Sequence, residues 1–518
     1  MDTGIGGQLG WLAMPEPPSS LGRYVDRTDA LLATWWSDGS WDTLEGLIGA
    51  WSNLMDHPDF PGAGSDFQMF CHDRAALALC WRAAEKSDPN DLDAARVHLD
   101  RVIAGQPNWS HDLHYHLGIY YYNCAAIAGR QEDAQRAVTI LRKLLVELPP
   151  NESRLRPRCL DVLGRSLLWL HDRDSRLADL NEGIELLRAS LLGFAVDAPY
   201  RRLVATATAA ALHSRFKGTG RLADLDAAIN VLICETSSSS FANSTALGHS
   251  MCGMLLRDRF RTHGDIGDLK DSLAWHERAV AVSPKGGRIF PIALTNQGNC
   301  LLTMFEHCRD TQFLYRSLQI QYEAVEITRP EDKYYPSRLN NLANCLTTTF
   351  DTTSDASYLD QSIELYGQAI ALAPPTDPDL PSRHYNRANS LAHRHELSRR
   401  RHDRDAAMHH YREACRSGLT LAAEWTLGAA LAWGRWTSVR GLWIEAKEAY
   451  DFGMRAVEQL FVSQTSRYHK ETWLRSAQGL STQAAYAYVR NGHAEAAVVV
   501  QERGRALLLA EALGHRGV

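Results

Sequence analysis

The chain has 518 residues, of which 45 % are hydrophobic and 22 % are charged, and its formal net charge at pH 7 is −6. This is an ordinary composition for a soluble protein, and the small negative charge gives no global reason to expect nucleic-acid or membrane binding. No apolar run reaches the length that a transmembrane helix needs.

The ends and the cysteines favour a cytoplasmic location. The first twenty residues lack the basic start and the long apolar stretch of a secretory signal. The ten cysteines are scattered through predicted helices, and none forms a CxxC pair. This pattern indicates buried thiols in a reducing compartment rather than a disulfide framework.

The N-terminal third is the least regular part of the chain. Residues 1–87 match no repeat and hold six of the fourteen tryptophans. We expect an irregular helical cap here, with residues 1–20 loosely held, because the end units of a repeat stack must shield it from water. Residues 88–173 hold degenerate repeats, since 91–107 and 131–150 resemble the second helix of the regular units.

Residues 174–400 repeat with a period of about 45 residues, and each unit is predicted to contain two helices. Proline starts the first helix and a large aromatic residue closes it, whereas the second helix carries a leucine and a small alanine at fixed places. These positions are Pro291, Pro336 and Pro381; Phe216, Phe260, Phe305 and Phe350; Leu180, Leu225, Leu269, Leu314 and Leu359; and Ala279, Ala324 and Ala369.

Residues 401–518 contain further degenerate repeats and a C-terminal capping or linker helix. The whole pattern predicts an all-α chain, a right-handed α-solenoid of about nine or ten helix pairs. First helices are expected to line its inner face and second helices its outer face.

The unit resembles a tetratricopeptide repeat. Asn-Leu-Ala-Asn at 341–344 stands where that family has its Leu-Gly core, and Ala369 and Pro375 match its second-helix alanine and closing proline. The segments 335–350 and 259–280 resemble more closely the repeats that precede CHAT domains, which are caspase-like proteases. The segment 501–513 resembles the helix that leads into such a domain. The chain reaches only Val518, with the protease domain absent, so the resemblance implies a sensor or regulatory partner of a caspase-like effector.

The sharpest candidate site is a ladder of asparagines at positions i and i+3 of the first helices, returning every 45 residues. An amide side chain both donates and accepts, so it can clamp the backbone of an extended peptide. An arginine one turn earlier adds a fork for a carboxylate. The alternative is that these side chains bond to neighbouring helices and define the stacking. The candidate residues are Asn296, Asn299, Arg338, Asn341, Asn344, Arg383, Asn386 and Asn389.

Two other patterns are weaker. The basic stretch 383–404 has the charge for binding nucleic acid, but it lacks interleaved aromatic residues and is also typical of a solvated turn. His111, His114 and His116 lack further ligands at convincing spacing, so no metal and no cofactor is expected. We found no catalytic motif, and nucleic acid is an unlikely partner by this reading.

The first functional hypothesis is therefore a scaffold that binds a protein or peptide ligand in a concave groove, with a caspase-like protease as a possible partner. The runner-up is an enzyme or small-molecule-binding protein built on the same scaffold. Its basis is the concentration of histidine, tryptophan and tyrosine in the N-terminal third. A third hypothesis is nucleic-acid binding through 383–404.

Overall fold

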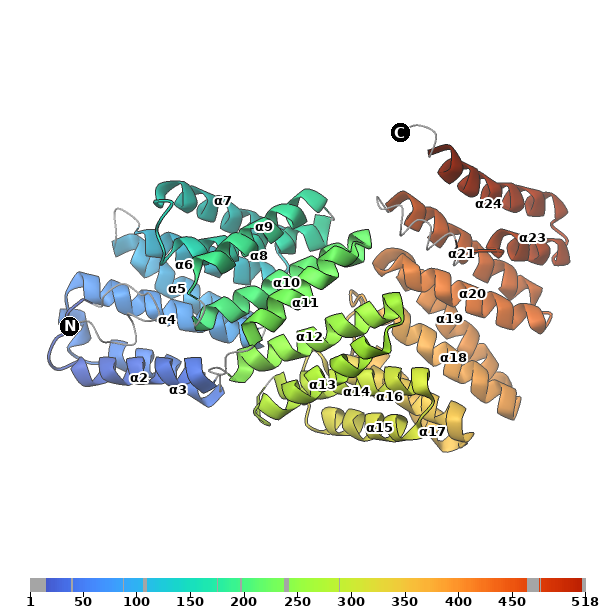
Figure 1. Ribbon diagram of the computed structural model, residues 1–518, viewed down its shortest axis with the longest axis horizontal. Coiled ribbons are helices and arrows are strands. Elements are labelled where there is room, and N and C mark those ends of the chain that lie inside the picture. Colours follow the sequence, from blue (N-terminus) through green and yellow to red (C-terminus); the bar gives the residue numbers. More distant parts are fainter. Residues whose placement is uncertain are drawn as a thin grey trace. The chain divides into compact units, whose positions relative to one another are not determined.

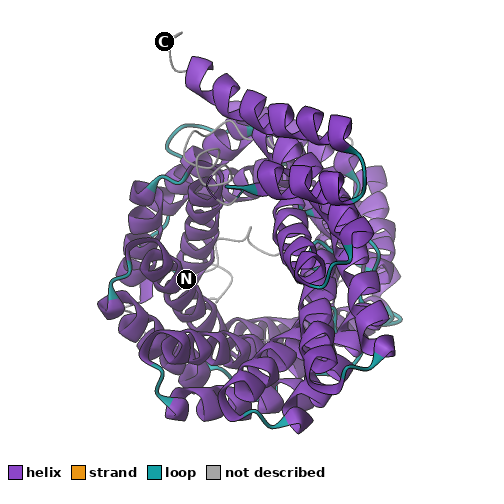
Figure 2. Cartoon of the chain, turned by 90° about the vertical axis from the view of Figure 1, so that its right-hand side faces the viewer, coloured by secondary structure: helices purple, strands orange, loops and turns teal. Residues whose placement is uncertain are grey.

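The computed structural model describes residues 15–38, 41–86, 88–105, 110–174, 176–195, 198–236, 242–287, 289–463, 475 and 477–514 (Figure 1). In this part of the chain all regular secondary structure is helical (Figure 2), so the prediction of an all-α fold is confirmed. The chain divides into two compact units. One comprises Met1–Phe216 and Arg221–Ala293, and the other comprises Lys217–Gly220 and Leu294–Val518.

The helices of the first unit follow one another with short connections. They are α2 (Gly22–Asp38), α3 (Trp41–Met55), η1 (Phe60–Gly62), α4 (Ser65–Lys86), α5 (Pro89–Gly105), α6 (His111–Ala128), α7 (Gln131–Glu147), α8 (Arg156–Asp174), α9 (Leu177–Gly193), α10 (Pro199–Thr219), α11 (Leu222–Thr236), α12 (Ala242–His263) and α13 (Ile266–Val282).

The helix α14 (Ile289–Cys308) begins in the first unit and lies mostly in the second. The remaining helices of the second unit are α15 (Thr311–Glu326), α16 (Tyr335–Thr353), α17 (Ala356–Leu372), α18 (Leu380–Ser398), α19 (Arg401–Leu421), α20 (Ala423–Val439), α21 (Trp443–Ser463), α23 (Leu480–Arg490) and α24 (Ala494–Gly514).

Each unit is an α-solenoid of helix pairs, such as α4 with α5, α12 with α13 and α18 with α19, and the last described pair is α23 with α24. The predicted start signal fits this division, because Pro336 and Pro381 are the second residues of α16 and α18. The recurring leucines and alanines of the second helices, such as Leu314 and Ala324, are fully buried and form the seam of each pair. Among the helices that the structure describes, none combines the length and the apolar character needed to cross a bilayer.

A repeated ion pair fixes how the two helices of a pair meet. In four pairs of the described chain, an arginine near the end of the first helix bonds to an aspartate nine residues later, in the first turn of the second helix. We call this contact the arginine staple. Its members are Arg82–Asp91, Arg215–Asp224, Arg259–Asp268 and Arg394–Asp403, with shortest N–O distances of 2.6 to 2.7 Å.

The same guanidinium also reaches back to the preceding second helix. Nη1 of Arg259 donates to Asp226 on α11 over 2.8 Å, and Nη1 of Arg394 donates to Asp360 on α17 over 2.8 Å. Because the guanidinium presents several donors in a rigid plane, one side chain can join three helices. The arginine staple therefore sets both the pairing within a repeat and the contact between repeats.

Candidate functional site

The second asparagine of each predicted pair is held by its own repeat. Its side-chain oxygen accepts a hydrogen bond from a residue on the second helix, always 22 positions later in the chain. This constant offset means that the three contacts occupy equivalent places. They join Gln321 Nε2 to Asn299 Oδ1 (2.9 Å), Tyr366 OH to Asn344 Oδ1 (2.6 Å) and Tyr411 OH to Asn389 Oδ1 (2.6 Å).

A small residue beside the asparagine makes room for this contact. A Cβ atom placed on Gly298 would lie 2.6 Å from Nε2 of Gln321, closer than real Cβ contacts come. Gly298 therefore leaves the space through which the Gln321 side chain crosses the first helix, and a larger residue would displace the end of that side chain. The equivalent residues beside Tyr366 and Tyr411 are Ala343 and Ala388, and both are fully buried.

A polar network joins α16 to α18, the first helices of neighbouring repeats. Nδ2 of Asn386 donates to Oδ1 of Asn344 over 3.0 Å and lies 3.4 Å from Oδ1 of Asn340. The hydroxyls of Thr347 and Ser390 are 3.3 Å apart. Polar groups in such a partly buried seam must satisfy one another, so these contacts specify how the two helices align.

The two arginines of the candidate site lie inside the protein. Arg338 is 3 % exposed and Arg383 is 1 % exposed. Nη1 of Arg383 donates to Asp377 over 2.7 Å, and Nη2 donates to Ser337 of the preceding first helix over 3.0 Å. Nη1 of Arg338 lies 3.6 Å from Asp332, and burial lowers the pKa of this arginine. These placements favour a structural role for both guanidinium groups.

The first asparagine of each pair falls in the same half-buried range as the second. Asn296, Asn341 and Asn386 are half-buried on α14, α16 and α18. Within the described part of the chain, the side chain of Asn341 makes no hydrogen bond, whereas Asn386 bridges to α16. The structure thus shows second positions that are locked by the second helices, and one first position, Asn341, that forms no side-chain hydrogen bond with a described residue.

The partners that lock the ladder were not predicted from the sequence. Gln321, Tyr366 and Tyr411 stand 45 residues apart, so the repeat itself carried a signal at this position. The changing residue type hid that signal, because only the hydrogen-bonding function is kept. His276 precedes them in the same register, where its buried ring packs over Gly253 instead.

The arginines of the basic stretch 383–404 are largely paired with carboxylates. Arg394 bonds to Asp360 and Asp403, and Arg399 lies 2.8 Å from Glu396. Arg401 and Arg404 both contact Asp405, 3.6 and 2.9 Å away. Neighbouring carboxylates reduce the attraction of such arginines for phosphate, so this geometry favours the solvated-turn interpretation.

The predicted histidine cluster on α6 is used for packing. Nδ1 of the buried His116 lies 2.7 Å from Oδ1 of Asp73 on α4, and His114 bonds the backbone of Ser110. Across the described residues, no group of three or more histidine, cysteine, aspartate and glutamate side chains is arranged to hold a metal ion.

No family model and no curated protein matches the sequence. Among solved structures, the human IFIT1 dimer with m7Gppp-AAAA is 12 % identical with a TM-score of 0.46, and the match covers 85 % of this chain and 90 % of that one. The apo form of RapI is 10 % identical with a TM-score of 0.42, over 85 % and 99 % of the two chains. The apo form of the quorum sensor NprR from B. thuringiensis is 12 % identical with a TM-score of 0.42, over 77 % and 97 %. Likenesses this distant do not indicate a ligand.

Proposed function

We propose that this protein is a scaffold that binds an extended protein or peptide segment along α14, α16 and α18. The observation that carries the proposal is the division of the asparagine ladder. The second positions are locked by the second helices. The first positions, Asn296, Asn341 and Asn386, are half-buried at a regular spacing, and the side chain of Asn341 makes no hydrogen bond to a described residue.

This division suits recognition of a peptide backbone. A free amide offers a donor and an acceptor to a peptide group without demanding a particular side chain. Because the neighbouring asparagines are fixed by hydrogen bonds, little further ordering of the helices is needed when a ligand binds. The buried Arg338 and Arg383 then serve as supports that position the first helices, rather than as direct contacts with the ligand.

Two alternatives receive less support. Nucleic-acid binding through 383–404 is disfavoured by the carboxylate partners of Arg394, Arg399, Arg401 and Arg404. The alternative that the protein is an enzyme has no support from a cluster of catalytic side chains on the first helices described above.

The resemblance to repeats that precede CHAT domains supports a finer proposal, in which bound ligand is reported to a caspase-like partner through the C-terminal helices. Its test is removal of residues 495–518. We expect the truncated protein to bind a peptide ligand with unchanged affinity and to lose the partner. A matching loss of peptide affinity would show that this segment is structural instead.

The binding proposal is tested with the full chain on a random peptide array, followed by affinity measurement for the peptides that are retained. Asn341→Ala is the most informative variant, because it removes a half-exposed amide that bonds to no described residue. We expect its peptide affinity to fall about tenfold, as expected for the loss of one or two hydrogen bonds. Asn151→Ala, an exposed change in the loop after α7, is the control and should bind as the parent does.

Unfolding of both variants should be measured alongside. A fall in affinity with an unchanged melting temperature assigns Asn341 to the ligand. If Asn296→Ala, Asn341→Ala and Asn386→Ala all leave peptide affinity unchanged, the ladder is not the binding surface. If the array retains no peptide, the scaffold does not bind extended peptides.

A further inference from the structure

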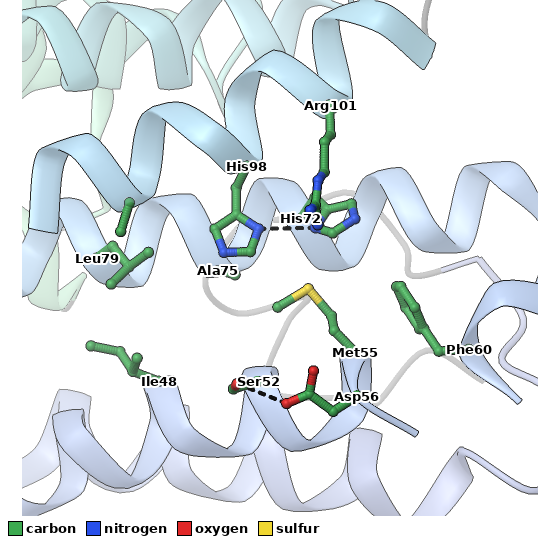
Figure 3. Close-up of a pocket in the computed structure, with 11 residues that line it drawn as sticks. Ile48, Ser52, Met55, Asp56, Phe60, His72, Ala75, Leu79, His98 and Arg101 are labelled. Atoms are coloured by element: carbon green, nitrogen blue, oxygen red, sulfur yellow. Dashed lines mark hydrogen bonds between the residues drawn. The ribbon is translucent and has the colours of Figure 1, made fainter. Parts of the chain in front are cut away.

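A cavity of about 390 Å³ lies between α3, α4 and α5 in the first unit (Figure 3). Its size falls within the lower part of the range of small-molecule sites, which is roughly 300 to 1,000 Å³. Ile48, Met55 and Leu79 form an apolar wall, and the polar side chains are Ser52, Asp56, His72, His98 and Arg101. This is the composition of a ligand pocket, in which a few polar groups orient a ligand against an apolar surface.

The two histidines face each other across the helix pair. Nδ1 of His72 on α4 is 2.9 Å from Nδ1 of His98 on α5, so one ring donates and the other accepts. Burial, then the neighbouring His98 and Arg101, lower the pKa of His72 to about 4. Burial and Arg101 likewise lower the pKa of His98. Near neutral pH the pair is therefore uncharged and offers the cavity hydrogen-bonding groups without a charge.

The repeat does not require histidines at these places. Histidines the same 26 residues apart occur in α18 and α19, where Nδ1 of His384 is 2.9 Å from Nδ1 of His410. One repeat earlier, the equivalent positions hold Leu339 and Leu365. Since an apolar pair serves the same place in the fold, the histidines at 72 and 98 need an explanation beyond helix packing.

Two opposite charges line the cavity without meeting. Arg101 extends from α5 toward the His72 ring, and Asp56 approaches from the end of α3 on the other side (Figure 3). Asp56 accepts a hydrogen bond from Ser52 over 3.3 Å. Within the described part of the chain, no ion pair forms between Asp56 and Arg101, and Arg101 has no carboxylate partner. The space between them is bounded by the histidine pair and the apolar wall.

We propose that this cavity binds a small zwitterion with an apolar body, of the chemical class of an apolar α-amino acid. Its carboxylate would lie at Arg101 and the histidine pair, and its ammonium group at Asp56 and Ser52. Its apolar side group would cover Ile48, Met55 and Leu79. A ligand with both charges pairs with Arg101 and with Asp56. A simple anion would leave Asp56 unpaired beside it, and such an unpaired charge weakens binding.

The test uses the full chain and free leucine, isoleucine, methionine, valine and phenylalanine as probes, in isothermal titration calorimetry and thermal-shift measurements. We expect at least one of them to bind and to raise the melting temperature. Its N-acetyl and its amide derivative, which lack one charge each, should bind about tenfold or more weakly. Arg101→Gln and Asp56→Asn should each lower the affinity for the free amino acid by a similar factor of about ten.

Two variants serve as matched controls. Asp93→Asn changes an exposed carboxylate on α5 outside the cavity lining, and His410→Gln breaks the equivalent histidine pair of the second unit. Both should bind the amino acid as the parent does. Arg101 and Asp56 are exposed, so their variants should fold and can be checked by circular dichroism.

The proposal fails if none of the five amino acids binds. It also fails if the N-acetyl derivative binds as tightly as the free amino acid, because the ligand is then an anion. If Arg101→Gln or Asp56→Asn binds the amino acid as tightly as the parent protein does, the amino acid binds outside this cavity. These outcomes are independent of the peptide experiment, since the cavity and the asparagine ladder lie in different units.

Discussion

At the scale of single residues, the asparagine ladder shows how one side-chain type takes two roles within a repeat. Asn389 accepts a hydrogen bond from the buried Tyr411, while Asn341, at the first position of its own pair, stays half-exposed. A buried hydroxyl without a partner costs free energy, so Tyr411 and Asn389 depend on each other. This dependence makes the locked position a point of stability, which is separate from the binding role that we propose for Asn341.

Replacing Tyr411 with phenylalanine tests the lock. The change removes the hydroxyl and leaves Asn389 without that donor, so the free energy of unfolding should fall by about 1 to 2 kcal/mol. Tyr322 provides the control, because its hydroxyl bonds Gln361 at an exposed site, and Tyr322→Phe should cost less than about 0.5 kcal/mol. Urea unfolding of each variant measures both values. Equal losses of unfolding free energy in the two variants would mean that the buried hydrogen bond contributes no more to stability than the exposed one.

At the scale of helix pairs, the repeat in the sequence predicted where helices lie, but it did not predict which side chains bond to one another across the helices. Recurring leucines and alanines such as Leu314 and Ala324 mark core positions, because only small or apolar residues fit the seam. The arginine staple was also visible as Arg and Asp nine residues apart, yet charged residues at helix ends are common enough to hide it. Opposed charges such as Asp56 and Arg101 come from separate helices, so only the folded chain brings them to one cavity.

The histidine pair of α18 and α19 gives a second test at this scale, through pH. Burial is the main cause that lowers the pKa of His384 to about 4 and of His410 to about 3, and Glu413 opposes the lowering at His384. Arg387 and His409 add to the lowering. The unfolded chain therefore takes up protons below its histidine pKa of 6.5 while the folded chain does not. Stability should be full above pH 6.5 and fall as the pH drops toward 4.

Leucine at both positions, as at 339 and 365, removes the titrating groups. We expect the double variant His384→Leu with His410→Leu to lose less stability than the parent between pH 6.5 and 4, by on the order of 2 kcal/mol. Denaturant unfolding at several pH values measures the difference. Parallel curves for the parent and the variant would show that the pair does not titrate in this range.

At the scale of the whole molecule, a chain of stacked pairs distributes its stability locally. Each repeat contacts mainly its neighbours, so damage in one place should spread only a short distance. The two units reinforce this, since each has its own internal packing. Regions near a weakened pair should open while distant pairs remain closed.

Arg259→Gln tests this locality. The change removes the bonds from α12 to Asp268 and Asp226, and it leaves the largely buried Asp268 without its guanidinium. Losing these charge-assisted bonds should cost about 1.5 to 3 kcal/mol. Amide hydrogen exchange should become faster in α11, α12 and α13 and stay unchanged in α18 and α19. Faster exchange along the entire chain would instead show that the molecule unfolds as one cooperative body.

The arginine staple also limits how such a chain can grow. In four pairs the arginine and its aspartate are nine residues apart, so the turn between the two helices has one permitted length. An added residue there would carry the carboxylate out of reach of the guanidinium. The staples themselves, at Arg82, Arg215, Arg259 and Arg394, are separated by about three, one and three repeats of the 45-residue period. Insertions and deletions should therefore be rejected in the turn inside a stapled pair.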